Sequence, residues 1–277
     1  MLDAPMLPRP HTAPAPAARR AESGTLGRMG GLVARLARSD AEVEAAQRLR
    51  HRVFVRECGA SREGREDGRE RDALDAACDH LLVLDGTRIV GTYRLLRCEV
   101  AARAGGHYSA AEFHLGPMLA HHPRRRFLEL GRSCTLPAYR TRRTIELLWQ
   151  GVWAYALAHR LDVMFGCASL PGLDPEAHKG VFGFLARHAA APSEWTARGR
   201  DPVAALPDFA DEAAHPREAL AALPPLVKGY LRLGGRVGPD VVADPDFHCL
   251  DLMMVLPREA IAPRYLAHYG ADARRFA

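Results

Sequence analysis

Charged residues at the ends of the expected helices and strands are the side chains of this sequence best suited to chemistry. They are Arg50, Asp72, Asp75, Arg94, Glu129 and Arg132. Because an unpaired charge buried between strands costs several kcal/mol, we expect these residues to pair with one another. Such pairing builds either a structural ion-pair network or a site in which a carboxylate accepts a proton and an arginine binds a carboxylate. The residues alone leave both interpretations open.

The common catalytic signatures are absent from the sequence. It contains no GxxxxGKS/T phosphate loop, no HExxH metal motif, no GxGxxG after an expected strand and no GxSxG nucleophile turn. The 13 histidines do not fall into metal-ligand spacing, so no metal site is predicted. Cys134 follows Ser133 in an expected strand with no histidine nearby in the sequence to activate it, and we interpret it as a structural thiol.

Composition and charge restrict the class of protein. Of the 277 residues, 48% are hydrophobic and 26% are charged, as in a globular protein with a sizeable core. No apolar run approaches the ~18 residues needed to span a bilayer. The six cysteines include no CxxC pair and the chain starts without a secretory signal, which predicts a reduced protein of the cytoplasm.

The net charge of +5 predicts an acidic partner, which could be an acidic protein, anionic lipid or nucleic acid. Nucleic acid fits poorly, because only 7% of the residues are aromatic and the basic residues are interleaved with acidic ones.

The order of the expected elements predicts the fold class. Ser39 and Glu42 form a capping box before an amphipathic helix over residues 40–57, and Asp85-Gly86 indicates a hairpin turn between two strands. Further strands are expected at 31–37, 126–136, 163–169 and 249–256, and further helices at 142–160, 175–188 and around Tyr265. A hairpin followed by alternating helices and strands predicts an α/β fold with a mixed sheet, built as a three-layer αβα sandwich.

Composition also divides the chain into segments. Residues 1–28, rich in proline and alanine, predict a disordered tail. Residues 29–277 are expected to form a single domain with an insertion of helices and loops at about 190–246. Residues 61–75 are interpreted as a charged surface loop that could fold over a ligand.

Several motifs resemble those of known acyltransferases. The series Arg50-x-x-Val53-Phe54, Asp72-x-x-Asp75, residues 91–96 and Glu129-Leu130-Gly131-Arg132-Ser133 resembles two branches of the GNAT superfamily that depend on acyl carrier protein. These branches are the acyl-homoserine-lactone synthases and the L-ornithine N-acyltransferases. The second resemblance is closer and covers roughly residues 30–270, with further motifs at 78–83, 108–113, 128–134, 147–151, 165–169 and 224–232.

The resemblance implies a GNAT fold in which strands 126–136 and 163–169 splay apart around the pantetheine arm of an acyl carrier protein. The chain would transfer a 3-hydroxyacyl group to the α-amine of L-ornithine, giving the lysolipid precursor of ornithine lipids. It would need no metal and no cofactor besides the phosphopantetheine thioester that serves as co-substrate.

The resemblance also implies roles for the charged residues. Glu129 would act as general base or orient the amine, although the sequence is equally compatible with a residue that only pairs with Arg94 or Arg132. Asp72 and Asp75 would bind the ammonium groups of the amino acid. Arg94, Arg132 or Lys228 would bind its carboxylate.

Residues implied in binding the acyl-pantetheine and its carrier protein are Ser133, Thr135, Arg140, Arg142, Arg143 and Ser169. The chain departs from GNAT enzymes that use coenzyme A, because Tyr139-Arg140-Thr141-Arg142-Arg143-Thr144 replaces their glycine-rich pyrophosphate turn. Three arginines suit the single phosphate of pantetheine and an acidic carrier protein, which favours that protein over coenzyme A as donor.

Two alternatives remain open at this point. An acyl-homoserine-lactone synthase would share the charged constellation but use S-adenosylmethionine; the segment 228–234 and the insertion speak against it. A non-catalytic lipid-binding protein could use residues 220–233 and the arginines to hold a membrane surface. The enzyme itself would also contact an anionic membrane peripherally, on its cytoplasmic face, through residues 124–126 or 220–233.

Overall fold

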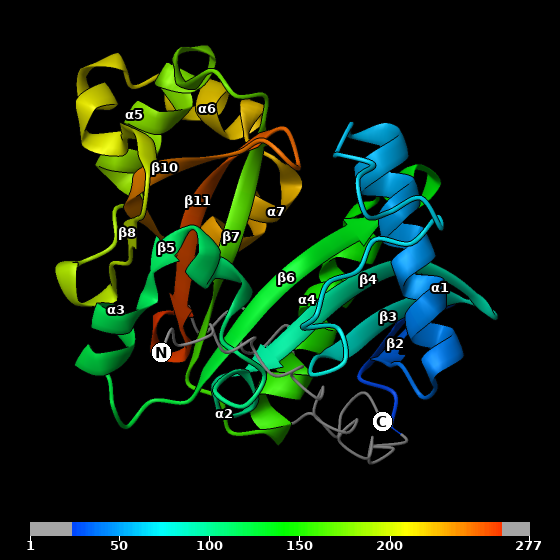
Figure 1. Cartoon of the computed structure of the whole chain (residues 1–277). Helices are drawn as coiled ribbons and strands as arrows, with labels where there is room; N and C mark the ends of the chain where they lie inside the picture. Colours follow the sequence, from blue (N-terminus) through cyan, green and yellow to red (C-terminus); the bar gives the residue numbers. More distant parts are fainter. Residues whose placement is uncertain (1–23, 262–277) are drawn as a thin grey trace, which may run out of the picture.

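The computed structural model of the chain describes residues 24–261, which are built around one nine-stranded mixed sheet (Figure 1). Its strand order is β1-β2-β3-β4-β6-β7-β11-β10-β9. The strands are β1 Gly27–Met29, β2 Leu32–Leu36, β3 Asp79–Asp85, β4 Arg88–Arg97, β6 Phe127–Thr135, β7 Val163–Pro171, β9 Pro202–Ala205, β10 Arg236–Asp244 and β11 Cys249–Pro257. A separate two-stranded sheet pairs β5 Phe113–His114 with β8 Arg198–Gly199.

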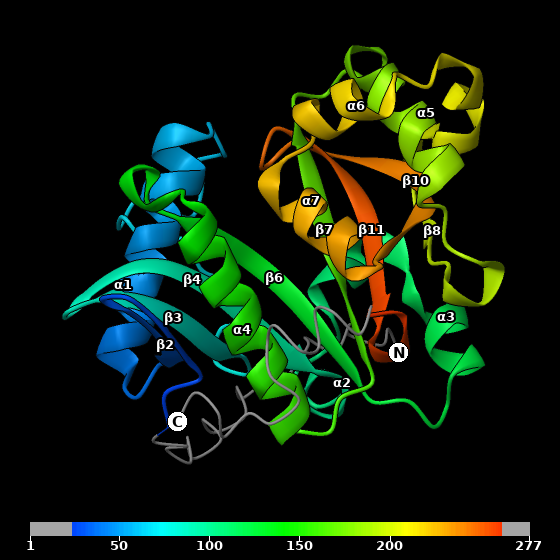
Figure 2. The ribbon, with the colours of Figure 1, turned by 180° about the vertical axis from the view of Figure 1, so that it is seen from behind.

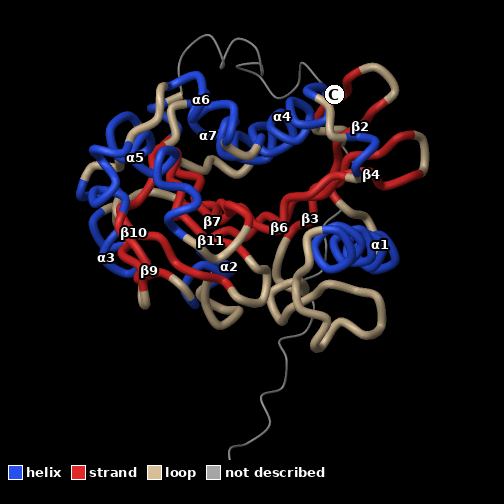
Figure 3. Tube along the Cα trace, turned by 90° about the horizontal axis from the view of Figure 1, so that it is seen from above, coloured by secondary structure: helices blue, strands red, loops and turns tan. Residues whose placement is uncertain are grey.

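Helices cover both faces of the large sheet. They are α1 Asp40–Arg50, α2 Cys98–Ala101, α3 Leu115–His121, α4 Arg142–Ala158, α5 Lys179–His188, α6 Pro216–Ala222 and α7 Pro225–Leu233. Seen from above, α4, α6 and α7 lie on one side of the strands and α1 on the other (Figure 3). The α/β fold and its three layers are therefore confirmed. None of the helices described between residues 24 and 261 has the length and apolar character required to cross a membrane.

Local signals in the sequence explain two elements that the site depends on. Ser39 caps α1, because its Oγ accepts a hydrogen bond from the Glu42 amide at 3.3 Å. The helix continues without a break as a π-helix over His51–Glu57, so the predicted helix 40–57 is confirmed. Gly86 has φ 57°, the left-handed conformation that the predicted hairpin turn between β3 and β4 requires.

The sheet opens in its middle, between β6 and β7. These strands pair in parallel only where Phe127–Glu129 faces Val163–Phe165, and then diverge, as Figure 1 shows. Gly166 marks the last close approach, because a Cβ on it would lie 2.1 Å from the Leu130 carbonyl oxygen. From behind, α4 lies over the β3-β4-β6 half and α7 over the β7-β11 half (Figure 2). The expected splay of two central strands is confirmed.

Three predictions about the elements need correction. The stretch 190–246 contains more than helices and loops, because β9 and β10 belong to the main sheet and β10 pairs with β11. The loop 61–75 is not purely a surface loop, since Glu70 is only 1% exposed and Asp75 only 5%. Residues 27 and 28 of the predicted tail are part of β1. The rest of that tail up to residue 23, and the helix expected around Tyr265, lie outside the described residues.

Candidate active site

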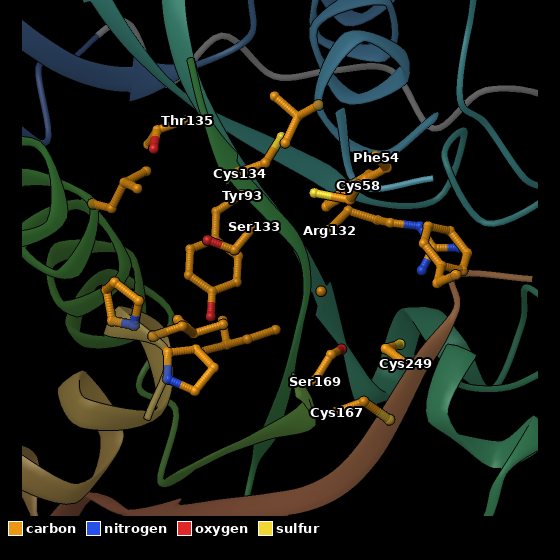
Figure 4. A pocket seen from close by; sticks show the side chains of 18 of the residues that line it. Phe54, Cys58, Tyr93, Arg132, Ser133, Cys134, Thr135, Cys167, Ser169 and Cys249 are labelled. Atoms are coloured by element: carbon orange, nitrogen blue, oxygen red, sulfur yellow. The ribbon is translucent and has the colours of Figure 1, made fainter. Parts of the chain in front are cut away.

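A cavity of about 400 Å³ fills the opening between β6 and β7. Ser133 and Thr135 of β6 line one wall, and Ser169 of β7 lies across from them beside Cys167 (Figure 4). Arg140 also lines the cavity. An apolar wall is contributed by the π-helix, α4 and the start of α7 through Val53, Phe54, Ile145, Leu148, Trp149 and Leu226. Four of the predicted donor residues are thus brought together around one space.

A bulge in β6 shapes the cavity where the strands part. The pairing with β4 shifts register between Thr92 and Arg94, and Arg132 adopts φ 54°, an uncommon conformation for a residue with a side chain. The guanidinium of Arg132 lies between two aromatic rings, 4.1 Å from the centre of Tyr108 and 4.4 Å from that of Phe247. These contacts hold the strained turn in place and put Arg132 in the lining of the cavity.

The predicted charged residues form a buried network. Arg50 contacts Glu70 at 2.7 Å and Asp75 at 2.6 Å, Arg94 contacts Asp72 at 2.7 Å and Asp75 at 3.4 Å, and Arg132 contacts Glu70 at 2.9 Å. Burial would raise the pKa of Asp75, but Arg50 and Arg94 outweigh it and hold that pKa below its usual value. Three arginines thus balance three carboxylates. Glu70, which the sequence did not single out, completes the set.

Glu129 faces the turn formed by residues 107–109. Its Oε1 accepts hydrogen bonds from the Ser109 amide at 2.7 Å and the Ser109 hydroxyl at 2.6 Å, and its Oε2 accepts one from the Tyr108 amide at 3.0 Å. His107 Nδ1 lies 3.1 Å from the same oxygen. Burial opposes ionisation, yet the His107 and Ser109 contacts lower the pKa of Glu129. The carboxylate is 3% exposed and is bonded to this turn rather than to Arg94 or Arg132.

A second cavity of about 650 Å³ adjoins the first. The two share Tyr108, Arg132, Asp244 and Phe247 in their linings. The second is rich in carboxylates, and its charged lining residues are Arg65, Asp72, Glu112, Arg132, Asp244 and Asp246. Of the two predicted ammonium-binding residues, Asp72 reaches this cavity, whereas Asp75 is buried in the ion-pair network.

Three carboxylates to which the sequence analysis assigned no role gather near the junction of the cavities: Glu112, Asp244 and Asp251. Cys167 Sγ donates to Glu112 at 3.6 Å, and Cys249 Sγ donates to Asp251 at 3.5 Å. Burial and the neighbouring Asp251 raise the pKa of Glu112 to about 9, and burial raises that of Asp251. Asp251 is a charged residue within an otherwise apolar strand, as Arg94 is, and this pattern could have identified it as a candidate from the sequence.

The remaining predicted residues lie apart from this junction. Lys228 Nζ donates to the Ala221 carbonyl at 3.0 Å. Arg140 pairs with Glu57 at the edge of the first cavity, and Arg142 pairs with Glu146 within α4 at 2.7 Å. Arg143 is exposed on the first turn of α4. The three arginines therefore mark the surface at one end of the opening.

Known proteins match this chain over most of its length. A family described as "Acetyltransferase (GNAT) domain" matches residues 49–150. An L-ornithine N(alpha)-acyltransferase of Rhizobium meliloti is 53% identical over 92% of this chain and 89% of its own length. Enzymes of the same name from Agrobacterium fabrum and Rhodobacter capsulatus are 49% and 38% identical, over 91% and 85% of this chain and 89% and 93% of their own lengths.

Proposed function

The chain belongs to the L-ornithine N(alpha)-acyltransferase family, and we propose that it transfers an acyl group from acyl carrier protein to the α-amine of L-ornithine. The observation that carries this proposal is the pair of adjoining cavities. One lies between splayed strands and has an apolar wall, and the other is rich in carboxylates. An acyl thioester fits the first space, and an amino acid with two ammonium groups fits the second.

The donor site follows from the opening of the sheet. Beyond Glu129 and Phe165, β6 and β7 no longer pair with each other, so their facing backbone groups can bond to the amides of a pantetheine arm as an added strand would. Leu148, Trp149 and Leu226 offer an apolar surface for the acyl chain. Arg140, Arg142 and Arg143 would receive the phosphate and the acidic surface of the carrier protein.

The acceptor site follows from charge. Asp72, Glu112, Asp244 and Asp246 line the second cavity and would attract the ammonium groups of ornithine. Arg132 is our candidate for the carboxylate of the amino acid, because it lines both cavities, whereas Arg94 and Lys228 line neither of them.

The reaction proposed here forms one amide bond and breaks one thioester bond. The neutral amine attacks the carbonyl carbon, a backbone N–H near the bulge of β6 stabilises the oxyanion, and the pantetheine thiol leaves. Glu129 would act by fixing the turn that carries Tyr108, since all four of its contacts go to residues 107–109. Neither a metal ion nor a covalent enzyme intermediate is required.

Incubation of the purified chain with 3-hydroxyacyl carrier protein and ornithine, lysine or glutamine, followed by mass spectrometry, tests this function. We expect an Nα-acyl product from ornithine and a marked preference for carrier protein over acyl-CoA. The triple substitution Arg140→Glu, Arg142→Glu and Arg143→Glu should raise the KM for the carrier protein at least tenfold, and Arg103→Glu, at an exposed turn, serves as the matched control. Absence of an ornithine product would refute the function, and equal use of acyl-CoA would refute the proposed donor.

Peripheral contact with an anionic membrane is a further part of the proposal, since the product would be a lipid. Leu220 of α6 is 41% exposed and could enter the membrane interface. Val227, Tyr230 and Leu233 of α7 are instead buried, so the contact would be smaller than residues 220–233 suggest. Sedimentation with vesicles containing anionic lipid tests it, and Leu220→Ser should weaken binding.

A further inference from the structure

Glu112 and Asp251 lie where the opening of the sheet begins. Asp251 of β11 stands opposite Ser169 of β7, and Glu112 accepts a hydrogen bond from Cys167, the residue that follows Gly166. Gly166 is the point of last contact between β7 and β6. Asp251 lines the first cavity and Glu112 the second, so the two carboxylates mark the place where the thioester and the amino acid would meet.

This pair lacks the compensation given to other buried carboxylates. Glu70, Asp72 and Asp75 each have an arginine within ion-pair distance, whereas no ion pair among residues 24–261 involves Glu112, Asp244 or Asp251. Asp251 is only 3% exposed, and its hydrogen-bond partners are uncharged or acidic: the Ser169 hydroxyl, the Glu112 carboxyl and the Cys249 thiol, the last at 3.5 Å. An uncompensated carboxylate at this depth needs a proton or a cation.

The titratable groups around the pair explain how it holds a proton. Asp244 of β10, Cys167 of β7 and Cys249 of β11 face it, and Tyr108 and the positively charged Arg132 line the adjoining cavity. Burial and the charge of Asp251 raise the pKa of Glu112 to about 9, and the pKa of Asp251 is raised as well. Two acidic groups in contact therefore share one proton near neutral pH.

We propose that the Glu112–Asp251 pair, built at the junction of the two cavities, is the general base that takes the proton from the α-ammonium of the acceptor. This inference rests on the proposed function. One N–H bond of the ammonium breaks and its proton passes to the pair, after which the amine nitrogen bonds to the thioester carbon. The C–S bond then breaks, and the second proton of the nitrogen goes to the departing sulfur, giving amide, thiol and one released proton.

The known requirements of a base favour this pair over Glu129. A base must have a free lone pair directed at the substrate and a proton affinity near that of the group it deprotonates. Near neutral pH the pair holds one proton, and burial together with the neighbouring carboxyl raises the affinity of its ionised member for a second proton towards that of amino groups, whose pKa values are about 8 to 10. Glu129 has a lowered pKa, and its oxygens face the turn 107–109. That turn leads directly into Glu112, so Glu129 becomes a positioning residue for the base.

The pH profile of Glu112→Gln tests the proposal. At neutral pH we expect kcat to fall by about 10²–10⁴-fold with little change in the KM for the acyl donor. The loss in kcat should shrink as the pH rises towards the pKa of the α-ammonium, because ornithine then binds with its α-amine already uncharged. Asp251→Asn should show the same trend more weakly, and Glu112→Asp should recover part of the rate. Glu176→Gln, the same change at an exposed position, serves as the matched control.

The outcomes separate the base from the function it serves. A wild-type enzyme that makes no acyl-ornithine refutes the proposed function. With an active wild type, Glu112→Gln and Asp251→Asn variants that keep near-normal turnover and an unchanged pH profile overturn the assignment of the base. A loss that is constant at every pH and confined to the KM for ornithine also overturns it, since it shows binding alone. Loss of wild-type activity in a chelator, reversed by added metal, would assign the cluster to a metal ion instead.

Discussion

Substitution of Arg50 tests whether the network of three arginines and three carboxylates supports the fold. The Arg50 side chain is 0% exposed, and its Nη2 donates to Asp75 at 2.6 Å and to the Glu70 carbonyl at 2.7 Å. Methionine fills a similar volume without charge, so Arg50→Met leaves two buried carboxylates short of one cation. Losing one partner of a buried ion pair costs about 3–5 kcal/mol. Because Glu70 keeps its contact with Arg132 and Asp75 keeps its contact with Arg94, we expect the free energy of unfolding to decrease by about 3–4 kcal/mol, in the lower part of that range.

Urea and thermal denaturation followed by circular dichroism measure this loss. For a chain of this size the expected change corresponds to a decrease in Tm of roughly 6–16 °C. Arg48→Met is the matched control, since Arg48 pairs with Glu44 on the exposed face of the same helix at 2.9 Å and should contribute less than about 0.5 kcal/mol. A decrease below about 1 kcal/mol in Arg50→Met, or equal decreases in the two variants, would refute the reasoning.

Three further changes test the opening of the sheet, a buried histidine and the positioning turn. Gly166→Ala places a Cβ 2.1 Å from the Leu130 carbonyl oxygen, so thermal denaturation should show a loss of about 1–3 kcal/mol or more in the free energy of unfolding. Gly131→Ala is the stability control, because a Cβ on Gly131 meets nothing within 4 Å. Burial lowers the pKa of His80 from 6.5 to about 4, so between these pH values the unfolded chain binds more protons than the folded one and stability falls as the pH drops. The urea midpoint of His80→Gln should therefore change less with pH over this range than that of the wild type. Glu129→Gln should lower turnover at least tenfold with unchanged circular dichroism, because the amide leaves donors of the 107–109 turn unpaired, and near-normal turnover would contradict the positioning role.

The sequence predicted the elements whose signals are local. The capping box at Ser39, the turn at Gly86 and the helical face of α4 each depend on residues within a few positions of one another. Strand β10 was missed because Gly238-Pro239 interrupts it and indicates a turn on its own. The pairing between β10 and β11 shifts register between Val237 and Val241, so the fold accommodates this dipeptide at a bulge. Such a bulge is defined by the pairing of β10 with β11, so it could not be predicted from the sequence of β10 alone.

The sequence also predicted that Arg50, Asp75, Arg94 and Arg132 would pair, but not with which partners. Glu70 joins Arg50 across 20 positions and Arg132 across 62, and nothing in the loop 61–75 distinguishes Glu70 from its charged neighbours. Partner choice follows from how the loop folds over β4 and β6. The sequence could therefore indicate most of the charged residues that belong to the network, but not which of them pair with each other.

Charge balance separates the supporting residues from those proposed to react. The network around Arg50 is neutral, and its buried carboxylates Glu70 and Asp75 already have arginine partners, so an incoming ammonium gains little from these two. Glu112, Asp244 and Asp251 have no such partner among the described residues, and holding them together costs free energy that an ammonium would recover on binding. An active site whose nucleophile arrives as an ammonium ion needs such an excess of negative charge at the place where the ammonium loses its proton. The junction of the two cavities meets this requirement, and the neutral network supports the bulge and the loop that border it.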